Sequence, residues 1–119
     1  MKIRVDPLDK LFSQYIKLRD KVCQRCGCYS ENLQTAHFFG RSRKSVRYDE
    51  DNACLLCFGD HMYFTARPLE FVEWFKKRLG EREFEMLQGR MRINFPKPDK
   101  KAITLYLQMK IAELENEMP

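Results

Sequence analysis

The sequence has 119 residues, of which 44% are hydrophobic and 33% are charged, and its net charge is +5 at pH 7. This length fits one domain, and the composition excludes disordered, collagen-like and low-complexity classes. No apolar run is long enough to span a bilayer, and the start of the chain lacks the apolar stretch of a signal peptide. We therefore expect a single cytoplasmic domain over 1–119 with no membrane partner. Its positive charge is compatible with nucleic acid as a partner.

The first half of the chain contains a clear helix signal. Apolar side chains recur at helical spacing after Asp6, a typical N-cap residue, and Pro7, which suits the first turn of a helix. Gly27 provides the backbone freedom that a tight turn needs. The expected elements, in chain order, are a helix over 6–20, a turn over 22–36, a strand entering at 33–39, a polar loop over 40–51 and a helix that begins near His61.

The C-terminal part, 67–118, is expected to be helical. Pro68 opens one helix and Gly80 ends it, and the predicted apolar face consists of Leu69, Phe71, Val72, Phe75 and Leu79, with Trp74 beside it. A short helix over 81–91 follows, then the helix-breaking sequence FPKP at 95–98 and a last helix over 99–118. The last helix has an apolar seam of Ile103, Leu107, Ile111, Leu114 and Met118.

That seam could pack on the N-terminal helix or pair two copies of the chain into a homodimer. Packing within the chain is the simpler interpretation for an amphipathic helix. We therefore predict a small, α-rich α+β domain with a β element around the cysteines.

The five cysteines indicate a metal site. An odd number of cysteines in a reducing compartment argues against a disulfide framework. Cys23 and Cys26 form one C-x-x-C loop, Cys54 and Cys57 form another, and two such loops supply the thiolates of a structural Zn²⁺ site. Alternatives for the fourth ligand are Cys54 and Asp60, with Cys28 as a third candidate.

Both histidines, His37 and His61, lie in the segment 21–65 that the cysteines bracket. The order C-x-x-C, A-H-F, D-E-D-N and L-C-x-x-D-H resembles the HNH (ββα-metal) endonucleases that carry a zinc knuckle. The stretches TAHFFGRS, RYDEDN, LCFGDHMYF and PLEFVEWFKKRLGEREFEML are similar to phage recombination endonucleases of the NinG/Rap type. The resemblance covers about residues 8–90.

This resemblance implies a ββα-metal core over 21–65 and metal-dependent hydrolysis of DNA phosphodiesters, on branched recombination intermediates in a phage-infected or prophage-bearing bacterium. It implies that His37 is the general base, that His61 holds a divalent cation (Mg²⁺ or Mn²⁺), and that Asn52 fixes the loop or orients His37. The basic residues of the loop would contact phosphates without reading sequence. They are Arg41, Arg43, Lys44 and Arg47.

The sequence departs from the family pattern at two positions. Ala36 stands where the family has a second metal ligand, so a carboxylate must substitute, and we favour Asp51 slightly over Asp49. Asp60 stands where the family's knuckle has cysteine, so the register of the family motif favours Asp60 as the fourth zinc ligand, whereas thiolate chemistry favours Cys54. The rival interpretation is a non-catalytic zinc module that binds DNA or protein, with the active site decayed at Ala36. Separate alternatives are that His37 or His61 completes the structural zinc site and that Asn52 is simply a turn residue.

Overall fold

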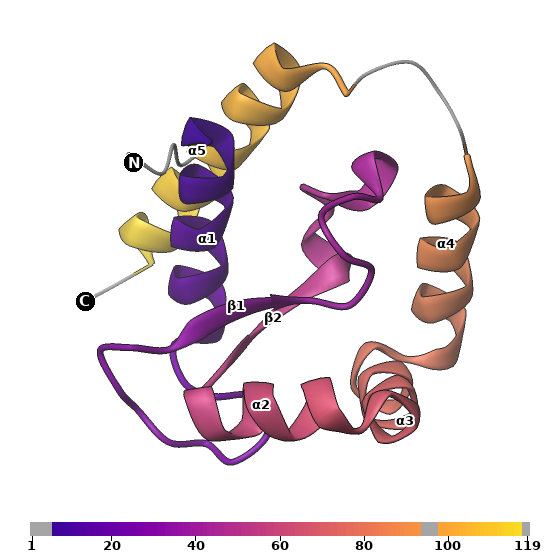
Figure 1. Cartoon of the computed structure of the whole chain (residues 1–119). Helices are drawn as coiled ribbons and strands as arrows, with labels where there is room; N and C mark the ends of the chain where they lie inside the picture. Colours follow the sequence, from indigo (N-terminus) through magenta and orange to yellow (C-terminus); the bar gives the residue numbers. More distant parts are fainter. Residues whose placement is uncertain (1–5, 94–97, 118–119) are drawn as a thin grey trace, which may run out of the picture.

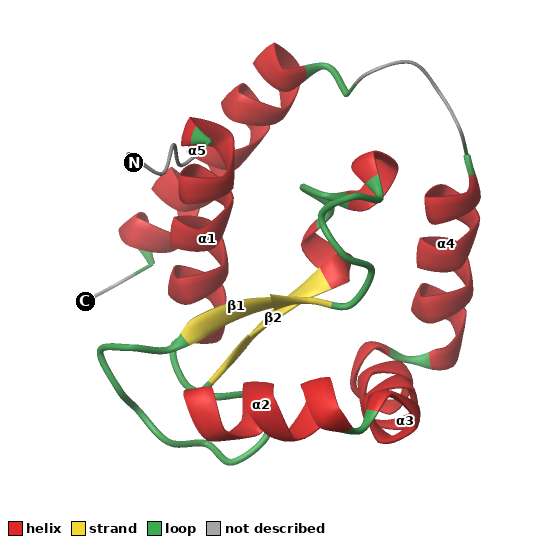
Figure 2. Ribbon diagram, in the orientation of Figure 1, coloured by secondary structure: helices red, strands yellow, loops and turns green. Residues whose placement is uncertain are grey.

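The computed structural model describes residues 6–93 and 98–117. It is a small α-rich fold in which helices surround a two-stranded antiparallel sheet (Figures 1 and 2). In the described part of the chain, every helix falls short of the length and apolar character that a bilayer span requires. The elements are α1 (Pro7–Asp20), β1 (Gln34–His37), the 3-10 helices η1 (Lys44–Val46) and η2 (Glu50–Asn52), β2 (Ala53–Leu56), α2 (Phe58–Ala66), α3 (Pro68–Leu79), α4 (Glu81–Arg92) and α5 (Lys100–Asn116).

The N-terminal helix begins as the sequence predicts. The Asp6 carboxylate accepts a hydrogen bond from the Leu8 amide at 2.8 Å, and Pro7 occupies the first turn of α1. The apolar face of α1 packs against α5, whose Leu107 and Ile111 are 1% and 7% exposed. The apolar seam of the last helix therefore packs on the N-terminal helix of the same chain, as the simpler interpretation predicted. Met118 lies outside the described residues.

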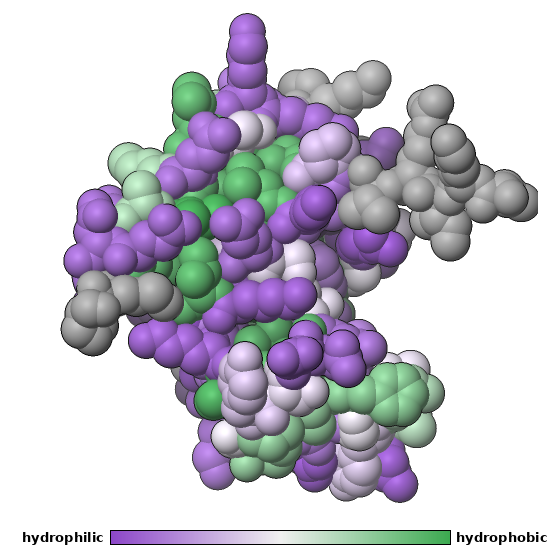
Figure 3. All heavy atoms as spheres, turned by 90° about the vertical axis from the view of Figure 1, so that its left-hand side faces the viewer, coloured by the Kyte–Doolittle hydropathy of each residue, from purple (hydrophilic) through white to green (hydrophobic). Residues whose placement is uncertain are grey.

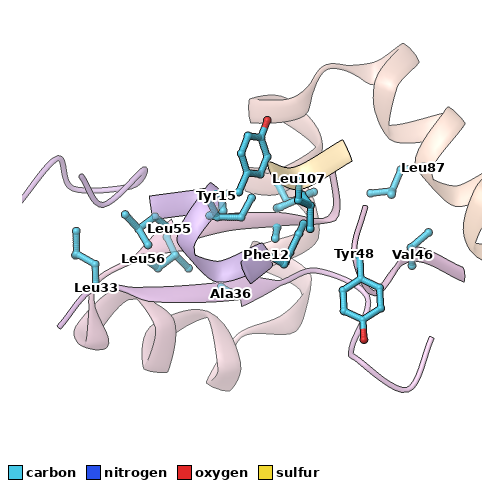
Figure 4. Packing of buried hydrophobic residues seen from close by; sticks show 14 of the residues in the cluster. Phe12, Tyr15, Leu33, Ala36, Val46, Tyr48, Leu55, Leu56, Leu87 and Leu107 are labelled. Carbon is cyan, nitrogen blue, oxygen red and sulfur yellow. The ribbon is translucent and has the colours of Figure 1, made fainter. Parts of the chain in front are cut away.

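The sheet sits between α1 and α2. In the antiparallel register Ala36 lies opposite Cys54 and His37 lies opposite Ala53. β2 is fully buried, which explains why its sequence is an uninterrupted apolar run. The elements expected in chain order included no strand at these residues. Figure 4 shows side chains of β2, α1 and α5 gathered in one cluster, among them Leu55, Leu56, Phe12 and Leu107.

The next helix, α2, begins at Phe58, earlier than the expected start near His61. The reason is a cap that sequence rules do not anticipate. The Cys57 sulfur accepts a hydrogen bond from the Asp60 amide at 3.4 Å and so takes the role usually filled by a serine or aspartate oxygen.

The predicted apolar face of α3 is only partly correct. Phe75 is fully buried and its ring stacks on Phe38 with centroids 4.7 Å apart, but Leu69 is 82% exposed and Val72 is 39% exposed. Gly80 separates α3 from α4 with φ 102°, a conformation that favours glycine. Of the predicted breaker at 95–98, residues 95–97 lie outside the described residues.

Candidate functional site

Four cysteine side chains form one cluster beside the N-terminus of α2. The sulfur atoms of this cysteine cluster, which consists of Cys23, Cys26, Cys28 and Cys57, all lie within 4.8 Å of one another. A turn brings the first three together, because the Cys23 amide donates to the Cys28 carbonyl and the Gly27 amide donates to the Cys23 carbonyl, each at 2.9 Å. Gly27 has φ 78°, which a residue with a side chain rarely adopts.

The spacing of these sulfur atoms suits a tetrahedral metal ion. A tetrahedron with Zn–S bonds of about 2.3 Å has sulfur atoms roughly 3.8 Å apart. The Cys26 and Cys57 sulfurs are 3.8 Å apart. The Cys57 sulfur also lies at a helix N-terminus, where the helix dipole would favour the thiolate form of a metal ligand. The cluster could therefore hold a structural metal ion such as zinc.

Asp60 lies against the cysteine cluster. One carboxylate oxygen, Oδ2, is 3.2 Å from the Cys23 sulfur and 3.4 Å from the Cys57 sulfur, while Oδ1 accepts from Arg25 at 2.6 Å. Burial alone would raise the pKa of Asp60, but the hydrogen bonds from Arg25 and the thiols lower it to about 2. The Asp60 carboxylate thus lies beside the thiols, and Arg25 balances the negative charge of this carboxylate.

The structure does not bring Cys54 to the cysteine cluster, and Cys28 takes the fourth thiol position instead. Cys54 is fully buried in β2 opposite Ala36, in the apolar core. Burial raises the pKa of Cys54 to about 12, so it behaves as a small apolar side chain. Of the two expected C-x-x-C loops, only the first one supplies both of its sulfurs.

The two histidines share a separate cleft of about 580 Å³ between α1, the sheet and α2. His37 ends β1 and His61 lies in the first half of α2, so the strand–strand–helix order brings them together. We call this the histidine cleft, and its lining residues are Asp9, Ser13, Gln34, Thr35, His37, Gly40, Arg41 and His61.

Hydrogen bonds define which nitrogen of each imidazole is available in the histidine cleft. The Nε2 atom of His37 donates to the Arg47 carbonyl at 3.1 Å, which leaves Nδ1 as the unprotonated nitrogen. The Nδ1 atom of His61 donates to Oε1 of Gln34 at 2.5 Å, which leaves its Nε2 able to bind a cation. Burial lowers the pKa of both His37 and His61, so both rings are neutral near pH 7.

Asn52 is fully buried and fixes the loop that joins β1 to β2. Its Oδ1 accepts from the Phe39 amide at 2.8 Å, and its Nδ2 donates to the carbonyls of Phe39 and Val46, each at 2.9 Å. These bonds hold the segment that directly follows His37. Asn52 therefore fixes the loop next to the histidine cleft, but its side chain does not line the cleft.

The two expected acidic partners of His61 lie away from the histidine cleft. Asp51 and Asp49 are bound by the Arg90 guanidinium of α4 at 3.1 Å and 2.6 Å, and neither lines the histidine cleft. Ala36 faces the core because side chains alternate along a strand. The carboxylate in the cleft is Asp9 of α1, which our sequence reading missed because it belongs to no motif.

The basic residues of the loop fall into two groups. Arg47 is held by Asp9, to which its Nε donates at 3.0 Å and its Nη2 also donates. Arg43 and Lys44 are exposed, and Arg41 is an exposed residue at the rim of the histidine cleft whose Nη1 lies 3.5 Å from Asp9. Arg43 and Lys44 are therefore exposed to a charged ligand, and Arg41 has only a long contact with Asp9.

Comparison of the chain with protein-family models, with curated proteins and with solved structures finds no match.

Proposed function

We propose that the chain is a metal-dependent DNA endonuclease of the HNH type, stabilised by a zinc ion in the cysteine cluster. The observation that carries the proposal is the histidine cleft, where the β1–β2–α2 unit brings His37 and His61 together with a buried Asn52 behind them. The order of these residues and elements is the one that the resemblance to HNH endonucleases implies.

In this proposal His37 acts as the general base. Its free Nδ1 accepts a proton from a water molecule, the resulting hydroxide attacks phosphorus, and the bond to the 3′ oxygen breaks. The departing oxygen takes a proton from solvent, which leaves 5′-phosphate and 3′-hydroxyl ends. The lowered pKa of His37 keeps the ring in the neutral form that this step requires.

His61 is the residue that would hold a divalent cation. Its unprotonated Nε2 fits this role, and water and phosphate oxygens would supply the remaining ligands of the ion. Such an ion would neutralise charge on the scissile phosphate. Within the described ranges, the cleft does not gather three ligand atoms as the cysteine cluster does. Arg41 at the rim would contact a neighbouring phosphate.

The rival function is a zinc module that binds DNA or protein without cutting it. Two observations favour it. Ala36 faces the core, and the Arg90 guanidinium binds the Asp51 carboxylate. Neither position therefore supplies a metal ligand near His61, and Asp9 is the carboxylate that lines the histidine cleft.

The test is cleavage of supercoiled plasmid and of a labelled four-way junction by zinc-loaded protein. Mg²⁺ or Mn²⁺ is added or simply omitted, because a strong chelator would also take the zinc. We expect cutting that needs the added ion and is lost in His37→Ala, while the exposed-surface variant Asn32→Ala cuts normally. Preference for the junction would support branched DNA as the substrate. Binding in a mobility-shift assay without cutting would contradict the proposal and support the rival.

A further inference from the structure

The outer face of α5 carries an apolar stripe that nothing in the described part of the chain covers. Leu105 is 67% exposed and Met109 is 52% exposed, and Ala102 and Ala112 are exposed beside them. These four residues, which we call the outer stripe, follow one another at alternating intervals of three and four residues. Figure 3 shows apolar side chains among hydrophilic ones on the face of the molecule that includes α1 and α5.

This spacing is that of the a and d positions of a helix pair. The buried seam of α5 uses Leu107 and Ile111 against α1, so the outer stripe is a second apolar face on the same helix. Exposed, contiguous apolar side chains of this kind commonly mark a protein–protein contact.

We propose that the outer stripe pairs with the outer stripe of a second copy of the chain, the two α5 helices running antiparallel about a two-fold axis. With the axis near the middle of the helix, Ala102 of one copy faces Ala112 of the other and Leu105 faces Met109. The contact is self-complementary, as a two-fold interface requires. It does not depend on the proposed nuclease function.

The charges of α5 favour the antiparallel direction. Lys101 lies in the first turn and Glu115 lies in the last turn, beside the outer stripe. The helix has no acidic residue in its first turn and no basic residue in its last turn, so its end charges oppose its own dipole. Antiparallel pairing places Lys101 of each copy beside Glu115 of the other, whereas parallel pairing does not bring these opposite charges together.

On the other flank of the stripe, Asp99 and Glu113 would approach each other across the axis. Both already have partners within their own chain. The Asp99 carboxylate caps α5 by accepting from the Ala102 amide at 3.1 Å, and Glu113 pairs with Lys110 at 3.7 Å. These contacts offset the repulsion on that flank, so the Lys101–Glu115 pairs determine the direction.

The dimer should be reversible. A helix of 17 residues is about 25 Å long. Two such helices bury less surface than the roughly 1,600 Å² of a standard interface. We therefore expect the fraction of dimer to rise with protein concentration.

The experiment is sedimentation velocity of the zinc-loaded full chain over a wide range of protein concentration, with a reducing agent that prevents cysteine cross-links. The wild type should shift from monomer to dimer as concentration rises. Met109→Glu should stay monomeric at concentrations where the wild type is a dimer. The matched control is Met86→Glu on α4, whose side chain is 48% exposed, and it should dimerise like the wild type.

Charge exchange tests the direction of pairing. Lys101→Glu and Glu115→Lys should each weaken the dimer, and the double variant should recover it. A chain that is monomeric at every concentration, or a dimer that survives Met109→Glu, would overturn the proposal. Failure of the double variant to recover would overturn the antiparallel arrangement. Circular dichroism confirms that each variant keeps its helices.

Discussion

Replacing Asn52 with alanine should destabilise the fold by about 3 kcal/mol. The side chain is fully buried and makes three hydrogen bonds, to the Phe39 amide, the Phe39 carbonyl and the Val46 carbonyl. Each bond of this kind contributes about 1 kcal/mol net, and its loss leaves a backbone group without a partner. The expected loss is a large share of the roughly 5–15 kcal/mol that stabilises a typical domain.

The assay is urea unfolding of zinc-loaded protein, followed by the fluorescence of Trp74. This is the single tryptophan of the chain, and it packs on Phe64 with ring centroids 5.0 Å apart. The control is Asn32→Ala, an exposed asparagine whose replacement should change stability by less than about 0.5 kcal/mol. A loss below about 1 kcal/mol for Asn52→Ala would refute the structural role inferred from its hydrogen bonds.

Three further predictions concern the histidine cleft and α3. Burial lowers the pKa of His37 and of His61, so both imidazole signals should titrate in NMR below the ordinary value of about 6.5. The neutral imidazoles then contribute to the stability of the fold above about pH 6.5, and this contribution is lost as pH falls through the lowered pKa values. Titration of either imidazole at or above about pH 6.5 would contradict the prediction. Asp9→Asn should cost about 2 kcal/mol in urea unfolding, because Arg47 loses the nearer of its two carboxylate partners and keeps Asp6 at 3.7 Å. It should also tighten DNA binding by removing negative charge from the histidine cleft, and unchanged affinity in a salt titration would contradict this expectation. Leu69→Gln should change the unfolding free energy by less than about 0.5 kcal/mol, since Leu69 is exposed, and a larger loss would place it in the core.

Local signals predicted most of the helices. The Asp6 cap, Pro7 and the helical spacing that follows them correctly identify α1, and the seam of the last helix correctly predicts its contact with α1. Local sequence signals failed where contacts between distant residues determine the secondary structure. The short apolar run of β2 reads equally as strand or helix, and only its pairing with β1 distinguishes the two.

The errors at the candidate site have the same origin. A second C-x-x-C spacing suggested Cys54, but β2 carries this residue into the core while the turn after Cys23 folds Cys28 back to the cluster. Asp9 reaches the histidine cleft from α1, far from the motif in sequence. Asp51 was plausible by proximity in sequence, but Arg90 of α4 binds it.

The most direct test of the cysteine cluster as the metal centre of this fold is the zinc content of two matched variants, Cys28→Ala and Cys54→Ala, measured by elemental analysis after dialysis. The four clustered thiols predict that the wild type and Cys54→Ala each retain zinc, while Cys28→Ala binds it weakly and loses it. Alanine suits both positions, since Cys54 is packed among apolar side chains and Cys28 is exposed. Loss of zinc from Cys54→Ala together with its retention in Cys28→Ala would contradict the arrangement of the cluster.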